Sequence, residues 1–148
     1  MLEPKTGENF AVVDLGNLEN LDQFKFEAPK LQVDGKIFLK DLLQLTGAEL
    51  SFNKLPVGKS VPFYHKHQQN EEIYIFIKGK GEFQIDGEIF PVQEGSIVRV
   101  DPAGERCWRN CGDTDLYCVV IQTRSGSYQG ATIQDGVGVK KQVTWSQN

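Results

Sequence analysis

Short extended runs separated by glycine-containing turns dominate the chain from residue 48 onward. The clearest pair is Glu82–Ile85 and Glu88–Val92, which flank the dipeptide Asp86-Gly87. This dipeptide favours a two-residue hairpin turn, because both central residues of such a turn need positive φ angles. Further turns are indicated by the glycines at positions 79, 81, 95, 104 and 112. Because no long stretch has the apolar period of a helix, the pattern predicts an all-β sandwich or barrel.

The chain has 148 residues, which is the length of a single domain. We expect a loose N-terminus at 1–9, N-terminal strands with a short helical turn at 10–57, a motif-bearing core at 58–122, and a C-terminal arm at 123–148. The arm is glycine-rich and weakly apolar, so we expect it to run over the surface instead of joining the core.

Composition argues against several classes of function. The net charge of -4 gives no electrostatic reason to bind nucleic acid or an anionic membrane. No apolar run approaches the ~20 residues needed to span a bilayer. The three cysteines form an odd number, which disfavours a disulfide framework and indicates a reducing compartment. The first ten residues also lack the basic and apolar regions of a secretory signal. We therefore expect a cytoplasmic protein that acts on a small polar molecule.

Both histidines of the chain, His65 and His67, lie two positions apart. On a strand, residues i and i+2 face the same side about 6.6 Å apart, so both rings can lean toward one metal ion. A carboxylate from a neighbouring strand would supply a third ligand and leave open positions on the metal. The alternative is that both histidines are solvated polar residues near a loop, and the pair by itself does not decide between the two readings.

The residues around the histidines follow a recognisable spacing. The first motif reads Gly58, six residues, His65-Lys66-His67, four residues, Glu72, six residues, Gly79. The second reads Gly95, six residues, Pro102-Ala103-Gly104, two residues, Cys107, with Asn110 one place early. These motifs resemble the two motifs of the cupin superfamily over Gly58 to about Ile121, although Cys107 stands where that family has a histidine.

The resemblance implies an all-β double-stranded β-helix, or jelly-roll barrel, with N-terminal extra strands and a C-terminal arm. It also implies one divalent transition metal ion held inside the barrel by His65, His67 and Glu72. Fe, Mn, Zn and Ni are not distinguishable at this stage. Glu72 is expected to be the ligand because it stands six residues before the glycine, whereas Glu71 falls on the opposite face.

The replacement at Cys107 leaves three alternatives. His65, His67 and Glu72 suffice with solvent in the fourth position, Cys107 binds as a thiolate and favours a softer ion such as Zn, or the site has lost its metal. Cys107 is otherwise a small buried hydrophobic residue in a strand, as most free cysteines are.

Side chains that share a side with these ligands are candidates for a substrate pocket. If Cys107 faces inward, Arg109 does too, and it either binds a carboxylate or phosphate or pairs with an acid at the rim. Arg106 and Trp108 would then point away from the pocket. Tyr74 and Phe76 share the side of Glu72, and Phe63 shares the side of the histidines; these are pocket candidates as well.

Two classes of function remain. One is a metal-dependent enzyme, such as a dioxygenase, isomerase or decarboxylase, acting on a small polar substrate. The other is a non-catalytic cupin that binds or senses a small molecule or a metal. No catalytic residue is assigned, since the fold hosts all of these activities. The strand at 72–77 is apolar on both faces, so we also expect a homodimer, in which Trp145 docks either on its own domain or on the partner.

Overall fold

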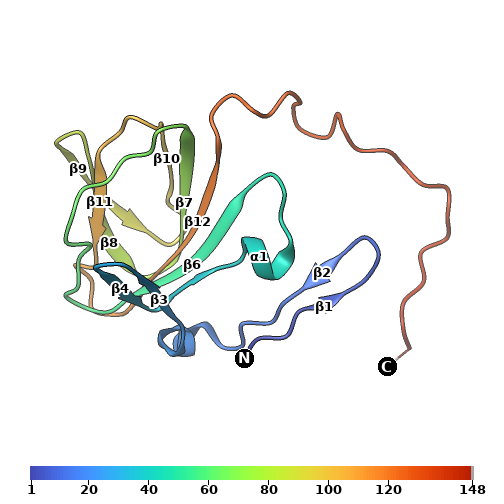
Figure 1. The fold of residues 1–148 in the computed structure, drawn as a ribbon, viewed down its shortest axis with the longest axis horizontal. Coiled ribbons are helices and arrows are strands. Elements are labelled where there is room, and N and C mark those ends of the chain that lie inside the picture. The colour runs from blue at the N-terminus through green and yellow to red at the C-terminus, as the bar shows by residue number, and fades with distance from the viewer. Residues whose placement is uncertain (148) are drawn as a thin grey trace.

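Two β-sheets face each other and enclose the core of the protein in this computed structural model, which describes residues 1–147 (Figure 1). The five-stranded sheet has the order β10 (Ile97–Val100), β7 (Asn70–Lys78), β12 (Leu116–Arg124), β6 (Glu49–Leu55), β5 (Lys36–Phe38). The three-stranded sheet has the order β11 (Arg106–Arg109), β8 (Lys80–Ile85), β9 (Glu88–Gln93). All paired neighbours in both sheets are antiparallel. The expected all-β double-stranded β-helix is thereby confirmed.

The remaining elements are short and lie on the N-terminal side of the barrel. They are the hairpin β1 (Lys5–Thr6) with β2 (Ala11–Val12), the 3₁₀ helix η1 (Leu18–Gln23), the hairpin β3 (Lys25–Ala28) with β4 (Leu31–Asp34), and the helix α1 (Lys40–Leu43). Part of the segment 1–9 is therefore a paired strand, whereas we expected the whole segment to be loose.

The turn between β8 and β9 has the geometry expected from its sequence. Asp86 has a φ of 49° and Gly87 a φ of 86°, and Ile85 pairs with Glu88 across the turn. Positive φ at both central residues fits a type I′ turn, whose twist matches that of the flanking strands. This turn therefore sets the register of the small sheet.

Aromatic side chains from both sheets fill the interior. Phe83 of the small sheet is fully buried and meets the ring of Tyr74 at 4.9 Å and that of Phe76 at 6.4 Å, measured between ring centroids. Trp108 of β11 meets Phe76 at 5.7 Å. The core occupies one end of the barrel, and polar side chains occupy the other end of the same inner face.

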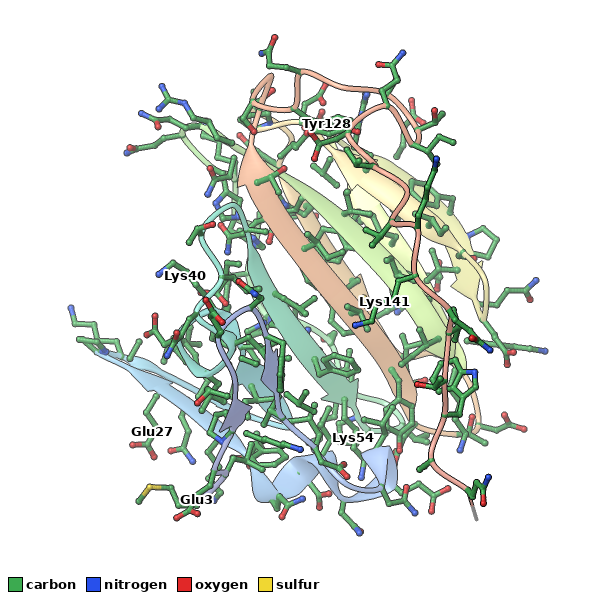
Figure 2. The ribbon with its side chains drawn as sticks, turned by 90° about the vertical axis from the view of Figure 1, so that its right-hand side faces the viewer. Glu3, Glu27, Lys40, Lys54, Tyr128 and Lys141 are labelled. Carbon is green, nitrogen blue, oxygen red and sulfur yellow. The ribbon has the colours of Figure 1, made fainter. Side chains whose placement is uncertain are left out.

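The C-terminal arm extends from the end of β12 away from the barrel instead of packing on it (Figure 1). Figure 2 labels Tyr128 and Lys141 along this segment. Trp145 is 87% exposed, so the expected docking of this ring on its own domain is not observed. Within residues 1–147, no helix is both long enough and apolar enough to cross a bilayer.

Candidate metal centre

The segment that carries both histidines lies beside β11 without forming a continuous strand. His65 and Arg106 exchange backbone hydrogen bonds, and the amide of His67 donates to the carbonyl of Pro102 at 2.9 Å. Pro62 has no N–H to donate, which interrupts regular pairing in this segment. The regular strand β7 begins only at Asn70, so the backbone of the histidine segment is not constrained by strand pairing on both sides, and both rings can point toward Glu72.

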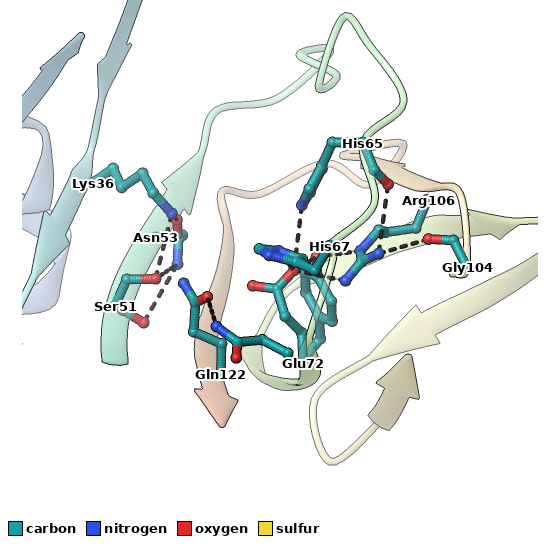
Figure 3. A network of polar contacts seen from close by, with 11 residues as sticks. Lys36, Ser51, Asn53, His65, His67, Glu72, Gly104, Arg106 and Gln122 are labelled. Atoms are coloured by element: carbon teal, nitrogen blue, oxygen red, sulfur yellow. Dashed lines mark hydrogen bonds and ion pairs between the residues drawn. The ribbon is translucent and has the colours of Figure 1, made fainter. Parts of the chain in front are cut away.

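His65, His67 and Glu72 converge on one point inside the barrel (Figure 3). Nε2 of His65 lies 3.2 Å from Oε1 of Glu72, and Nε2 of His67 lies 2.9 Å from the same oxygen. The three ligand atoms lie within 4.8 Å of one another. Glu72 comes from β7 and the histidines from the neighbouring loop, so the turn at residues 68–69 brings the three together.

Glu72 is ionised in this environment. Burial raises its pKa, but hydrogen bonds from His65 and Tyr74, together with the charge of Arg106, outweigh burial and lower the pKa to about 2. Tyr74 donates its hydroxyl to Oε1 of Glu72 at 2.9 Å. Burial raises the pKa of Tyr74 above its ordinary value, with the charge of Glu72 acting in the same direction. The centre therefore holds a carboxylate beside a neutral phenol.

Arg106 is the main site residue that the sequence analysis missed. Its side chain is fully buried and places Nη2 3.0 Å from Oε1 of Glu72. It also donates to the hydroxyl of Tyr74 at 3.3 Å and to the carbonyl of Gly104 at 2.6 Å. We expected Arg106 to point away from the pocket, and that expectation is wrong.

The reason lies in the stretch between Gly104 and Asn110, which is one residue shorter than the motif requires, whereas the stretch from Gly95 to Arg106 has the motif's length. Asn110 is buried and donates to the carbonyls of Leu55 and Thr114, both at 2.9 Å, which anchors the end of the strand. Counting back from Asn110 by the spacing of the motif gives Arg106, whereas counting forward from Gly104 gives Cys107. The early position of Asn110 was the signal that could have identified Arg106.

Cys107 and Arg109 are consequently placed on the other face of β11, because side chains alternate along a strand. Cys107 is not among the residues that converge with the histidines, and burial raises the pKa of its thiol, so thiolate ligation is not supported. Arg109 is exposed, and its Nε donates to Glu82 at 3.1 Å. The expectation that both side chains face inward is therefore wrong, and the rim pairing considered for Arg109 is what the structure shows.

The other pocket candidates take different positions. Tyr74 touches Glu72 directly. Phe76 is fully buried among Phe83 and Trp108, so it belongs to the core beneath the centre. Phe63 is 43% exposed, with its ring 6.4 Å from that of His65, at the outer edge of the centre.

Comparison with known proteins agrees with this architecture. A model of the cupin domain family matches residues 52–122. The crystal structure of a cupin protein from Bacteroides fragilis superimposes with a TM-score of 0.68 at 42% identity, covering 78% of this chain and 97% of that one. The chain belongs to the cupin superfamily.

Two curated relatives extend the comparison. An oxalate-binding protein of Thermotoga maritima is 38% identical over 68 residues, which cover 46% of this cupin and 55% of the relative. This cupin therefore matches little more than half of that relative's length. An uncharacterized protein of Methanocaldococcus jannaschii is 32% identical over 93 residues, which cover 60% of this cupin and 73% of the relative.

The side chains of this cupin fit a metal ion of the kind its family binds. Two imidazole nitrogens and one carboxylate form a donor set that suits divalent transition metals. Nε2 of His67 and Nδ1 of His65 are both buried, and neither forms a hydrogen bond of good geometry among the described residues, although Nε2 of His67 lies 2.9 Å from Oε1 of Glu72. A buried polar atom without a partner is costly, and coordination of Nε2 would satisfy it. The guanidinium of Arg106 lies beside these side chains, so the centre contains three candidate ligands and one buried arginine.

Proposed function

We propose that this cupin binds one divalent transition metal ion through Nε2 of His65, Nε2 of His67 and the carboxylate of Glu72, and holds a small polar molecule beside it. The observation that carries the proposal is the convergence of these three ligand atoms within 4.8 Å, with Nε2 of His67 forming no hydrogen bond of good geometry among the described residues. A bound ion would act as a Lewis acid toward an oxygen of the ligand.

The other residues of the centre orient the ligands and balance their charge. Arg106 and Tyr74 both donate to Oε1 of Glu72, which fixes the direction of the carboxylate. The positive charge of Arg106 repels a metal cation, so we infer weaker metal binding than at a centre with a neutral imidazole in that place.

The proposal is a binding function. A dioxygenase, isomerase or decarboxylase reaction with proton transfer needs a group that takes a proton near neutral pH. Tyr74, whose pKa is raised, and Glu72, whose pKa is about 2, do not meet this need; Lys36, whose pKa is lowered to about 8, comes nearest to it but lies on the other side of the inner face from the histidines, so no reaction is assigned. The name of the Thermotoga maritima relative, an oxalate-binding protein, supports a small carboxylate as the bound molecule.

A second candidate function is the binding of a small anion without a metal. It is favoured by the ion pair between Arg106 and Glu72 at 3.0 Å, since a guanidinium already compensates the carboxylate that a metal would otherwise neutralise. Under this alternative the histidines contact the small molecule directly.

Metal content of the purified protein separates the two candidates. After growth in metal-supplemented medium, elemental analysis should find close to one transition-metal ion per chain, and His65→Ala and His67→Ala should each lose most of it. The substitution Lys66→Met, at an exposed side chain between the histidines, is the matched control and should retain the metal. A wild-type protein without metal under these conditions would exclude the first candidate.

A further inference from the structure

Lys36 of β5 projects its ammonium group onto the same inner face as Glu72. It pairs in register with Asn53, and the next inward residue of β5, Phe38, pairs with Ser51. Asn53 and Ser51 are both buried on β6. In the sheet β6 is followed by β12 and then by β7, the strand that carries Glu72. Figure 3 shows Lys36 with Asn53 and Ser51 on one side and the metal centre on the other.

The contacts of Lys36 are neutral. Its Nζ donates to Oδ1 of Asn53 at 2.6 Å and to Oγ of Ser51 at 3.3 Å, and lies 4.6 Å from the centre of the Phe38 ring. Asn53 is itself held by a bond from Nδ2 to the carbonyl of Cys118 at 3.2 Å. Within residues 1–147, Lys36 forms no ion pair with a carboxylate. An ammonium has three N–H donors, so one remains for another acceptor.

Lys36 is the cation of this inner face that forms no ion pair among the described residues. Lys36 and Arg106 are cations, and Arg106 is paired with the carboxylate of Glu72. Glu49 also lies near this end, but its Oε1 accepts from the backbone amides of Lys40 at 3.0 Å and Leu50 at 3.1 Å. A cation taken out of water is costly without an anion. In agreement, burial lowers the pKa of Lys36 to about 8 despite the opposing charges of Glu72, Cys118 and Glu49.

The large sheet has a hollow at the end of the barrel where these polar side chains lie. Its volume is about 220 Å³, and it is lined in part by Glu49, Asn70 and Gln122, which share the inward side of their strands, but not by Lys36 or Glu72 themselves. The side-chain amide of Asn70 donates to that of Gln122 at 3.0 Å. Figure 3 shows Gln122 between the Lys36 group and Glu72, and Gln122 pairs in register with Glu72 on one side and Glu49 on the other, so the hollow adjoins the face that carries both groups.

We propose that Lys36, with Ser51 and Asn53, forms a subsite for the carboxylate of a small organic acid whose other end faces His65, His67 and Glu72. The ligand class is a small dicarboxylate, or a keto or hydroxy acid, that supplies the missing anion to Lys36. This inference rests on the proposed binding of a small molecule in the barrel, and it holds whether or not a metal is bound.

Calorimetric titration tests the subsite, with oxalate and malonate as probes and the neutral diamide malonamide as the chemical control. Wild-type protein at pH 7 should bind at least one of the diacids and not the diamide. Lys36→Met should weaken binding about tenfold or more, as loss of a charge-assisted contact does, and Lys36→Arg should retain it. Lys66→Met removes a positive charge from the exposed surface beside the histidines and should bind like the wild type.

Metal content measured on the same samples separates this inference from the proposed function. Diacid binding unchanged in folded Lys36→Met, or absent in the wild type, overturns the subsite whatever the metal content. If the wild-type protein contains no metal and still binds a diacid, and Lys36→Met binds it more weakly, the subsite is supported even though the metal proposal has failed.

If the methionine variant does not fold, wild-type binding measured from pH 7 to pH 10 gives the answer. Affinity should fall as Lys36 loses its proton, because Glu72, with a pKa of about 2, stays ionised over this range and burial raises the pKa of the Cys118 thiol to about 12. Affinity that does not change over this range overturns the subsite.

Discussion

Lys36 illustrates how a single buried cation affects both stability and binding. The difference between its ordinary pKa of 10.5 and the value of about 8 corresponds to a cost of about 3 kcal/mol at neutral pH. This cost remains although the ammonium donates hydrogen bonds to Asn53 and Ser51. A bound carboxylate would remove much of the remaining cost.

The pH dependence of unfolding measures this cost. Between pH 8 and pH 10.5 the folded protein has lost the Lys36 proton while the unfolded chain still binds it, so the free energy of unfolding should rise with pH. We expect the rise to be smaller in Lys36→Met by about 3 kcal/mol, measured by urea unfolding at a series of pH values. Because exposed lysines titrate in both proteins, only the difference between them is diagnostic. Parallel curves would show that Lys36 is not buried as described.

At the scale of elements, the orientation of β11 decides which side chain stands beside the ligands. The short stretch between Gly104 and β11 and the anchor at Asn110 together turn Arg106 and Trp108 inward. The same shift turns Cys107 outward. One residue in a loop thus exchanges a thiol for a guanidinium at the centre, because neighbouring residues of a strand face opposite sides.

Substitutions on the two faces of β11 should differ in their effect on metal binding. Arg106→His replaces a cation with a neutral potential ligand, so metal affinity should increase about tenfold or more, as measured by competition with a chelator. Cys107→Ser should leave both the affinity and the visible spectrum of the Co(II)-substituted protein unchanged. A changed Co(II) spectrum in Cys107→Ser would contradict the orientation of the strand.

The core beneath the centre depends on contacts between the two sheets. Phe83 brings the small sheet against the rings of Tyr74 and Phe76, and it is fully buried. Phe83→Ala should lower the free energy of unfolding by about 3–5 kcal/mol, as expected for an aromatic residue removed from a packed core. Ile89→Ala, at a 58% exposed position of β9, is the control and should change it by less than about 1 kcal/mol. Equal effects would mean that the sheets do not pack through Phe83.

At the scale of the whole molecule, the outer face of the large sheet remains only partly covered. Ile75 pairs with Ile97 on one side and Val119 on the other, and Val119 pairs with Phe52, which forms an apolar row across four strands. Ile97 at the end of this row is 67% exposed. Exposed apolar faces of this kind often mark interaction surfaces.

The expectation of a homodimer therefore stays a prediction, and light scattering at micromolar concentration tests it. We expect the mass of two chains, and a shift toward one chain in Ile97→Lys, since a charge in this row would have to be buried. Removal of the arm after Ser125 tests whether Trp145 contributes, by lowering the mass at the same concentration. A wild-type mass of one chain would exclude the dimer.

The sequence by itself indicated the all-β elements and, of its four candidate ligands, the three that the structure brings together, His65, His67 and Glu72, but it misplaced Cys107. Strand alternation, the Asp86-Gly87 turn and the spacing from His65 to Glu72 are local properties, so the all-β fold and the convergence of the two histidines with Glu72 could be predicted from them. The tertiary structure alone decided what surrounds that set. The orientation of Arg106 depends on where β11 is anchored, and the position of Lys36 depends on pairing between strands far apart in the chain. The roles of these two charged residues depend on burial, because leaving a charge unpaired is costly only where folding has removed it from water.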